Sequence, residues 1–455
     1  MKTLDQIAAE LQGYDPQALS ASDVNAFLSR LVEPVTQTET VHLFDALGRI
    51  LAVDVVSPLS VPPHDNSAMD GYAFNGALLT TANTPDAPLT LRVIGTALAG
   101  KAWTGTSGLS DCVKIMTGAI MPTGLDTVIP LEFVQHTDDT HISFPANLLR
   151  PGDNRRLKGE DLMQGQSALQ KGEHLTPAAL GLMASLGIAS VTVFRQLKVA
   201  YFSTGDEVLS LGEPPREGAV YDSNRYTVYG LLTRLGCKVI DLGVVRDDPT
   251  LLEAAFQNAV AQGADAIISS GGVSVGEADH TKAMMKKLGD VAFWRIAMRP
   301  GRPMAVGRIA QKQPENQRIS TEHADSAISM GTSSYQKNSA VLFGLPGNPV
   351  AVMVTFLAFV RPALLQMMGS TAKPLPLLKA RSTDALRKKA GRTEYQRGTV
   401  STAPDGSLTV KITGNQGSGV LSSMVQANGL IVLHHDQGNV NAGDTVDVMA
   451  FEGCI

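Results

Sequence analysis

Residues 269–279, Ser-Ser-Gly-Gly-Val-Ser-Val-Gly-Glu-Ala-Asp, decide the fold of the central part of this chain. They follow an apolar segment, residues 264–268, that predicts a buried strand, and they precede residues 282–288, which predict a helix ended by Gly289. A glycine turn between a strand and a helix directs backbone N–H groups and the positive end of the helix dipole at one point, which favours an anion such as phosphate. The acids Glu277 and Asp279 then suit a divalent cation beside the phosphate, or they are simply the acidic first turn of a surface helix.

The same alternation of strands and helices extends over residues 186–374. Strands are expected at 198–203, 237–242, 264–268, 304–306 and 340–343, and helices at 224–235, 249–262 and 282–288. This order predicts a doubly wound, mainly parallel α/β sheet whose ligands bind at the carboxyl ends of the strands. Polar turns fall at four of these ends, namely residues 204–207, 246–248, 269–279 and 345–349. We therefore expect one composite pocket along this edge of the sheet.

The complete chain of 455 residues is expected to be a multidomain α/β protein with smaller modules on both sides of the central sheet. We predict a discontinuous N-terminal domain, an inserted small β domain, the α/β domain and a C-terminal β-barrel-like domain, at residues 1–60 with 145–185, 61–144, 186–374 and 375–455 respectively. The polar stretch at about 311–338 has little periodicity and is expected to be a flexible loop insertion within the α/β domain.

Composition excludes several classes of protein. The chain has 38 Lys and Arg against 43 Asp and Glu, and a net charge of −5 argues against broad binding to nucleic acid or anionic membranes. Three scattered cysteines make neither a disulfide framework nor a zinc-ligand spacing, which indicates a reducing compartment. The N-terminal segment lacks the features of a signal peptide, and the longest apolar run, residues 350–360, is too short to span a bilayer. We expect a cytoplasmic protein.

Two segments before the central sheet carry candidate ligand-binding residues. Residues 61–73 place two acids among small side chains, which suits close approach of a ligand but is also common in polar loops. Thr117 follows a strand-like run and either donates to an oxyanion or closes a turn. Residues 155–161 mix three cations with two acids, so they form either a phosphate and metal site or a solvated, charge-paired loop.

Two further candidates follow the central glycine turn. Arg295, Arg299 and Arg302 surround a Pro-Gly turn, and a guanidinium group matches the geometry of an oxyanion; the alternative is salt bridges to nearby acids. Asn348 and Pro349 predict the start of a helix. That helix N-terminus is either open to a second anion or a well-capped buried end with no further role.

Six motifs together resemble the molybdopterin molybdenumtransferase (MoeA) family, whose eukaryotic relatives include the E domain of gephyrin. They occur in family order over nearly the whole chain: DNSAMDGY at 65–72, GED at 159–161, STGDE at 203–207, YDSN at 221–224, GGVSVG at 271–276 and LPGNP at 345–349. The resemblance implies an Mg²⁺-dependent enzyme that inserts molybdate into adenylated molybdopterin and releases AMP. It also implies four subdomains, an elongated N-terminal domain, and a homodimer whose active site lies between subunits.

The resemblance also implies which residues form the site. The implied catalytic residues are Asp70, Thr117, Asp161, Glu207, Asp247 and Asp279, and the implied metal ligands among them are Glu207, Asp247 and Asp279. The implied substrate-binding residues are Ser270, Gly271, Gly272, Ser274, Arg295, Arg299, Arg302, Pro346, Gly347 and Asn348. Members of the family commonly carry lysine at the positions of Arg295 and Arg299, and a guanidinium fork holds an oxyanion differently from an ammonium group.

Two other functions fit part of the sequence. A molybdopterin adenylyltransferase is a single domain similar to residues 186–370, but it lacks the motif at 65–72 and the flanking domains. A gephyrin-like assembly scaffold would need no intact acids, whereas this chain keeps them in every motif. The adenylyltransferase is also a candidate partner of this chain.

Overall fold

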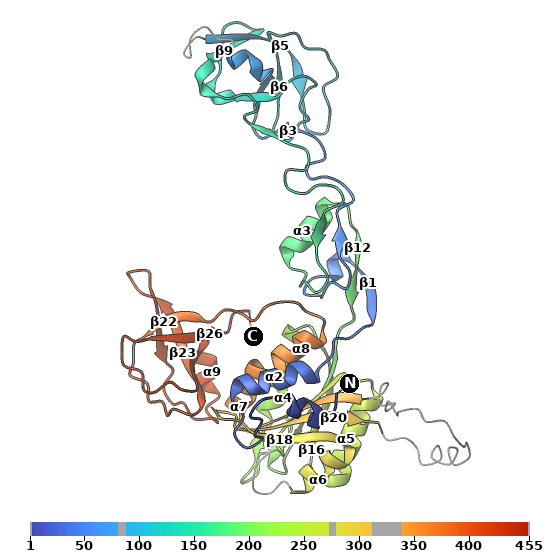
Figure 1. The fold of residues 1–455 in the computed structure, drawn as a ribbon, viewed down its shortest axis with the longest axis vertical. Helices are drawn as coiled ribbons and strands as arrows, with labels where there is room; N and C mark the ends of the chain where they lie inside the picture. Colours follow the sequence, from blue (N-terminus) through green and yellow to red (C-terminus); the bar gives the residue numbers. More distant parts are fainter. Residues whose placement is uncertain (1, 81–87, 273–278, 312–338, 454–455) are drawn as a thin grey trace, which may run out of the picture.

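The chain forms a broad body and a long arm that extends from it, as the computed structural model shows (Figure 1). The structure describes residues 2–80, 88–272, 279–311 and 339–453, and for residues 279–283 it describes the backbone alone. The predicted insertion at 311–338 lies, apart from its first residue, outside the described residues.

The body is built on a six-stranded sheet in the order β16-β13-β17-β21-β20-β18. The strands in that order are Lys238–Val245, Lys198–Thr204, Ala266–Ser270, Ser339–Leu345, Pro303–Ala310 and Gly289–Arg295. Only β20 runs opposite to the other five strands of this sheet, so the prediction of a doubly wound, mainly parallel sheet is confirmed. Strand β18 was not predicted, because Gly289 was interpreted only as the end of a helix.

Helices cover both faces of this sheet. One face packs against α4 (Ser223–Arg234) and the helix that starts with α7 (Pro349–Thr355), and the other packs against α5 (Pro249–Ala261) and α6 (Asp279–Leu288). Asp222 and Asp248 accept hydrogen bonds from the first turns of α4 and α5, which fixes where these two helices begin.

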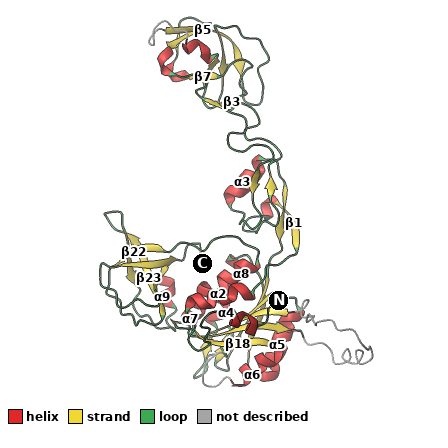
Figure 2. Cartoon of the chain, in the orientation of Figure 1, coloured by secondary structure: helices red, strands yellow, loops and turns green. Residues whose placement is uncertain are grey.

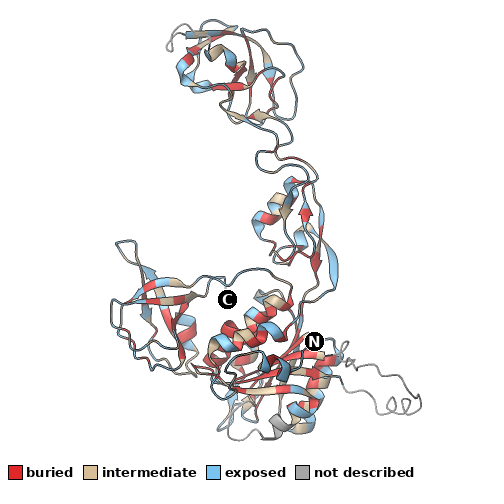
Figure 3. Cartoon of the chain, in the orientation of Figure 1, coloured by how far each residue is buried: buried red, intermediate tan, exposed pale blue. Residues whose placement is uncertain are grey.

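The helix that begins with α7 is longer than the apolar run suggested. It continues through the π-helical segment η6 (Phe356–Val360) and α8 (Arg361–Met367), so that Pro349–Met367 is long and apolar enough to cross a membrane. However, 72% of its most apolar window is buried inside the body, and Figure 3 shows this helix coloured mainly as buried. Such burial is typical of the core helix of a folded domain.

The first two helices belong to the body rather than to the arm. α1 (Leu4–Ala9) and α2 (Ala21–Leu31) share a hydrophobic core with the central sheet, and the ring of Phe27 packs edge-on against Trp294 at 4.9 Å. The sequence grouped these residues with the N-terminal domain. An apolar helix face requires a partner, but its periodicity does not say which partner it meets.

The arm holds two modules. The nearer one pairs β1 (Thr38–His42) with β12 (Ser190–Phe194) and β2 (Val55–Val56) with β11 (Ser167–Leu169), beside α3 (Pro177–Ser185). A narrow connection, β3 (Asn66–Ser67) with β10 (Arg155–Arg156), leads to the outer module. The outer sheet has the order β7-β4-β6-β5-β9-β8, with bounds Thr127–Pro130, Gly71–Phe74, Asp111–Ile115, Pro88–Ala97, His141–Pro145 and Gln135–His136. Short 3₁₀ turns lie at Leu43–Asp45, Gly76–Thr80, Leu131–Phe133 and Ala146–Leu148.

The C-terminal part is a closed five-stranded barrel, which confirms the predicted β-barrel-like domain (Figure 2). Its strands pair in the ring β23-β24-β22-β26-β25 and back to β23, with bounds Thr393–Thr402, Leu408–Ile412, Leu378–Ser382, Thr445–Ala450 and Gly429–Leu433. The short helix α9 (Ser422–Gln426) accompanies it. Strand β19 (Met298–Arg299) leaves the body and pairs with β23, so the barrel is tied directly to the loop that carries the predicted arginines.

Candidate active site

The polar strand ends meet at the switch point of the central sheet. β13 lies between β16 and β17, so the chain passes to one side of β13 first and to its other side afterwards. In open α/β sheets, ligands bind outside the carboxyl ends of the strands at such a point. The turns that follow β13, β16, β17 and β21 all lie along this edge.

Two exposed carboxylates gather at the end of β13. The side chain of Glu207 folds back over Gly205, since a Cβ atom added to Gly205 would lie 2.5 Å from Glu207 Oε2. The hydroxyl of Thr204, the preceding residue, donates to Asp247 Oδ1 from the turn after β16. Asp247 also donates its backbone N–H to Asp206 Oδ1 at 3.4 Å. The structure therefore brings the predicted residues Glu207 and Asp247 to the same strand end.

The loop after β17 leaves the sheet through two left-handed glycines. Gly271 has a φ of +93° and Gly272 a φ of +67°, and a Cβ atom on Gly271 would lie 2.3 Å from the carbonyl oxygen of Thr204. Only glycine allows this backbone to pass so close to the end of β13. Of the other predicted residues here, Ser274 lies outside the described residues, and the side chain of Asp279, the first residue of α6, is not described.

Ser270 lies beneath this loop rather than on its surface. Its side chain is 2% exposed, and its hydroxyl is 2.7 Å from the Tyr201 hydroxyl and 3.2 Å from that of Ser203. Burial raises the pKa of Tyr201, so its hydroxyl stays protonated and available as a donor. The sequence predicted that Ser270 contacts substrate, whereas the structure shows it supporting the loop from inside.

The predicted arginines lie at the same edge. β18 runs in the same direction as β21, so Arg295 at its end and the following residues Arg299 and Arg302 are placed beside the strand-end turns. The loop packs against α7, because a Cβ atom on Gly301 would lie 2.4 Å from Thr355 Oγ1. Arg295 is half-buried, and Arg299 and Arg302 are exposed.

The turn after β21 ends at the start of α7, as expected from its sequence. Pro346 is buried, whereas Gly347 and Asn348 are exposed. Asn348 occupies the N-cap position, with Pro349 as the first helical residue, but its side chain makes no capping hydrogen bond. Its exposed amide therefore points to a role other than the predicted cap.

The barrel adds a cation that sequence reasoning missed. Arg397 on β23 is 1% exposed, and its guanidinium donates to Ser423 Oγ at 3.0 Å and to the carbonyl oxygens of Asn415 and Gly417 at 3.2 and 2.9 Å. These acceptors are neutral; burial, and secondarily the charge of Arg299, lower its pKa to about 10. In the sequence, an arginine within a strand has no feature that separates it from an ordinary exposed one.

The loop that holds Arg397 also touches the body. Ser418 accepts a hydrogen bond at 3.1 Å from the backbone N–H of Val350, in the first turn of α7. The arginine is therefore held close to the turn after β21, and the barrel forms part of the wall of this edge.

The remaining predicted residues lie in the arm. Thr117 donates its backbone N–H and its hydroxyl to Asp70 Oδ1, both at 2.7 Å, in the outer module. These two bonds lower the pKa of Asp70, so its exposed carboxylate is ionised at neutral pH. Asp161 lies at the narrow connection, exposed, and its backbone N–H donates to the carbonyl of Val61.

Within one chain the predicted site is thus divided in two. Figure 1 shows the outer module, with β5 and β6, at the far end of the arm from α4 and β16 in the body. The nearer module of the arm lies between them. Asp70 and Thr117 cannot join Glu207 and Asp247 around one ligand in this arrangement of a single chain.

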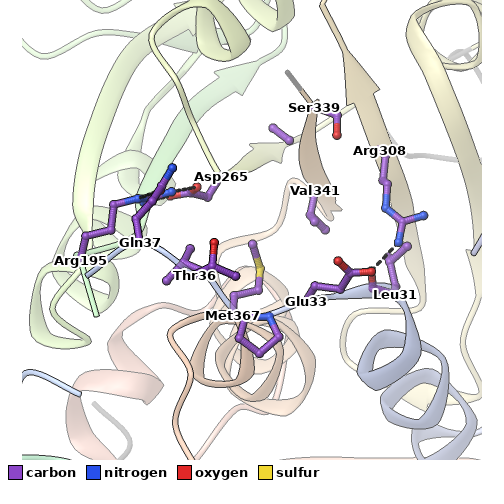
Figure 4. A pocket seen from close by; sticks show the side chains of 13 residues that line it. Leu31, Glu33, Thr36, Gln37, Arg195, Asp265, Arg308, Ser339, Val341 and Met367 are labelled. Atoms are coloured by element: carbon purple, nitrogen blue, oxygen red, sulfur yellow. Dashed lines mark hydrogen bonds and ion pairs between the residues drawn. The ribbon is translucent and has the colours of Figure 1, made fainter. Parts of the chain in front are cut away.

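A cavity lies at the opposite edge of the sheet (Figure 4). It measures about 650 Å³ and is lined by residues that precede β17 and β21 and by the chain that leads into the arm, such as Asp265, Ser339 and Gln37. Arg195 donates to both carboxylate oxygens of Asp265 at 2.7 and 2.6 Å across this cavity. Because the amino ends of the parallel strands meet here, we assign this cavity to the joint between arm and body rather than to catalysis.

Asp265→Asn should lower the free energy of unfolding of the body by about 2 kcal/mol, because Asp265 also accepts from the backbone N–H of Lys198 and loses its charge-assisted bonds. Urea unfolding monitored by tryptophan fluorescence measures this. The control is Asp405→Asn in the pair with Arg381, whose side chains are 60% and 49% exposed against 15% and 28% for Asp265 and Arg195. Equal effects of the two variants would contradict a structural role for the buried pair.

The chain matches family models along its whole length. The MoeA N-terminal region (domain I and II) matches residues 19–187, the probable molybdopterin binding domain matches 200–366, and the MoeA C-terminal region (domain IV) matches 379–451. A molybdopterin molybdenumtransferase of Haemophilus influenzae is 42% identical over 417 residues, 91% of this chain and 94% of that protein. One from a Nostoc species is 34% identical and covers 90% and 88%. The crystal structure of a molybdopterin biosynthesis MoeA protein from Pyrococcus horikoshii superposes with a TM-score of 0.75 and 25% identity, covering 95% of this chain and all of that one.

Proposed function

The chain belongs to the molybdopterin molybdenumtransferase (MoeA) family, an enzyme family of molybdenum cofactor biosynthesis, and from this premise we propose that it inserts molybdate into adenylated molybdopterin and releases AMP in an Mg²⁺-dependent reaction. The observation that carries the proposal is the switch-point edge of the central sheet. There, two exposed carboxylates, a glycine loop and three arginines lie on neighbouring strand ends.

This edge suits a substrate with several negative groups. Adenylated molybdopterin carries a diphosphate, and molybdate is an oxyanion. The left-handed backbone at Gly271 and Gly272 allows close approach of a phosphate, and the arginine forks match oxyanions in two-point contacts. We assign Arg299 and Arg302 to anion binding because both are exposed beside the turn after β21.

The residues present fit Mg²⁺. Glu207 and Asp247 offer hard carboxylate oxygens at the end of β13, where Glu207 lies over Gly205 and Asp247 accepts from Thr204. Within the described part of the chain, no three Asp, Glu, His or Cys side chains group around a metal position. Mg²⁺ is commonly held by one or two carboxylates, waters and substrate phosphates, so two carboxylates suffice. Bound there, with Asp279 as the third sequence-predicted ligand, the ion would neutralise charge on the phosphates where AMP leaves.

A second chain would complete the site. The family resemblance implies a homodimer, and the distance between arm and body gives it a physical reason, since Asp70 and Thr117 lie at the far end of the arm. In a two-fold dimer, the outer module of one chain could lie over the switch point of its partner. The ionised carboxylate of Asp70 would then contact the substrate from the other side. We place this reaction in the cytoplasm, with the molybdopterin adenylyltransferase as the source of substrate.

The decisive assay supplies purified protein with adenylated molybdopterin, molybdate and MgCl₂, and follows AMP by chromatography and cofactor formation by reconstitution of an apo-molybdoenzyme. We expect both products, and we expect EDTA to abolish them. Transfer of AMP from ATP to molybdopterin with release of pyrophosphate, and no reaction with the adenylated pterin, would instead support an adenylyltransferase. A chain that forms neither product, yet dimerises, would favour the scaffold alternative.

Asp247→Asn should raise the Mg²⁺ concentration needed for half-maximal AMP release by about 10-fold or more, because one ligand oxygen loses its charge while the bond from Thr204 can persist. The measurement is an Mg²⁺ titration at saturating substrate. Asp248→Asn, one residue along the same turn but engaged in capping α5, is the matched control and should leave the Mg²⁺ requirement unchanged. An unaltered titration for Asp247→Asn would remove this residue from the metal site.

A further inference from the structure

Asn224 connects the two strand-end loops without belonging to either. It is the second residue of α4 and is 9% exposed. Its side-chain Nδ2 donates to the carbonyl oxygen of Gly347, in the turn after β21, at 2.7 Å. The same nitrogen lies 3.4 Å from Ser270 Oγ, at the end of β17.

The two loops also touch each other directly. The backbone N–H of Gly271 donates to the carbonyl oxygen of Leu345 at 3.1 Å, and a Cβ atom on Gly347 would lie 3.8 Å from Gly271 Cα. The loop after β17 and the turn after β21 are therefore neighbours along the edge. The amide of Asn224 adds a second connection from a third element, the crossover helix α4.

The helix that carries Asn224 is itself firmly held. Asp222 Oδ1 accepts from the backbone N–H of Arg225, and the N–H of Asp222 donates to the carbonyl oxygen of Leu209. Further along α4, Val228 and Leu232 are fully buried in the core of the body. A movement of the amide relative to the sheet would have to displace this helix, so Asn224 is a rigid reference point for both loops.

The oxygen of the same amide shows that Asn224 does not satisfy all of its own hydrogen-bonding groups. Asn224 Oδ1 is buried and has no hydrogen-bond partner in the structure. A buried unpaired carbonyl oxygen costs stability, which an apolar residue at this position would avoid. What an apolar residue would lose is the bond to Gly347.

We propose that Asn224 is a positioning residue that fixes the turn after β21 against the loop after β17. Through these two segments it sets the affinity of the site for the phosphate end of the substrate. This inference rests on the proposed function for the identity of the substrate. The amide does not need to touch the ligand. It acts through Gly347, whose exposed turn leads into α7, and through Ser270, which supports Gly271 from beneath.

The test compares Asn224→Ala and Asn224→Asp with wild type. Both should raise KM for adenylated molybdopterin by about 10-fold while kcat changes less. Substrate affinity depends on the positions of the two loops, whereas the reacting groups are unchanged. Asn224→Asp should be at least as impaired, since a carboxylate cannot donate to the carbonyl of Gly347. Asn258→Ala, which removes an exposed amide on α5, is the matched control and should leave both constants unchanged.

A double-mutant cycle with Ser270→Ala separates positioning from general loss of structure. If the amide acts through the loop after β17, the KM effect of Ser270→Ala should be smaller in Asn224→Ala than in wild type. Fully additive effects on KM, or a lowered melting temperature with unchanged KM, would overturn the proposal while leaving the proposed function intact.

A readout that needs no turnover covers the case in which the wild type does not act on adenylated molybdopterin. Hydrogen exchange at residues 271–272 and 347–348 should be faster in Asn224→Ala than in wild type, with exchange in α5 unchanged. Unchanged exchange in both loops would overturn the positioning role by itself. If the wild type shows no turnover but exchange is faster in Asn224→Ala, the positioning role stands and only the proposed substrate is contradicted.

Discussion

Asp70→Ala and Asp247→Ala chains should each lose about 100-fold or more in kcat/KM, and purified mixed dimers of the two kinds of chain should recover about one half of wild-type activity. Each carboxylate is exposed, so neither substitution should unfold the protein. The large loss is expected because the carboxylates of Asp70 and Asp247 would lie at the reacting phosphates and would stabilise mainly the transition state.

The recovery follows from the separation of the two residues within one chain. If the outer module of one chain serves the body of its partner, a mixed dimer holds one site with both defects and one site with none. One of the two sites in each mixed dimer is therefore intact, which gives about one half of the wild-type activity per dimer. The experiment co-expresses the two chains with different affinity tags, purifies the doubly tagged species and measures AMP release for each assembly.

The matched control pairs two defects in the same part of the chain. Asp247→Ala with Glu207→Ala leaves every body damaged, and Asp70→Ala with Thr117→Val leaves every outer module damaged, so neither pair should recover activity. Recovery in these control pairs would mean that activity returns for another reason. No recovery in the Asp70→Ala and Asp247→Ala dimer would show that a site does not combine these two residues from different chains.

Gly271→Ala should lower the free energy of unfolding by about 3 kcal/mol and reduce AMP release to a small fraction of wild type. Its φ of +93° is strained for any residue with a side chain, and the added Cβ would lie 2.3 Å from the backbone carbonyl of Thr204. A backbone atom cannot move aside as a flexible side chain does. The end of β13 would have to shift instead. Glu207 follows this strand end and Asp247 is bonded to it through Thr204, so both carboxylates would be displaced.

The matched control is Gly406→Ala in the turn between β23 and β24. Gly406 has a φ of +81° and no atom within 4 Å of the added Cβ, so only the conformational cost of about 1 kcal/mol applies. Urea unfolding and AMP release are measured on both variants. Equal losses of stability would show that the close approach to Thr204 has no consequence, and normal activity of Gly271→Ala would exclude this loop from the site.

Much of the central fold could be predicted because its signals are local. The caps Asp222 and Asp248 mark helix starts, and the apolar segments that become β13, β17 and β21 are flanked by glycine and polar turns. The closed barrel at the C-terminus follows from regular alternation in strands such as β24 and β26. In contrast, β18 and the attachment of α2 to the body were missed, because both depend on a packing partner far away in the sequence.

The candidate site divides in the same way. The motifs themselves contain Glu207 and the glycine loop, since spacing within one turn is a property of the chain, and Asp247 was implied by the family resemblance. Arg397 was not singled out, and Asn224 was noted only as part of the motif at 221–224, because each gains its significance from burial and from partners in other elements. Ser270 was predicted to bind substrate, and nothing in the sequence indicated that its neighbours Tyr201 and Ser203 would hold its hydroxyl inside the sheet.

By itself, the sequence determined the strand–helix order, the chemistry of each strand-end turn and, through motifs in order, the family. It predicted a glycine turn between a strand and a helix at residues 269–279, which would suit a phosphate, because glycine and a helix start are local features. Only the tertiary structure decided that Gly271 passes against Thr204 and that Asn224 joins two loops. It also decided that Asp70, in the outer module, lies at the far end of the arm from Glu207 in the body. Those relations arise from packing between distant segments, and no local pattern in a chain records which surfaces will meet.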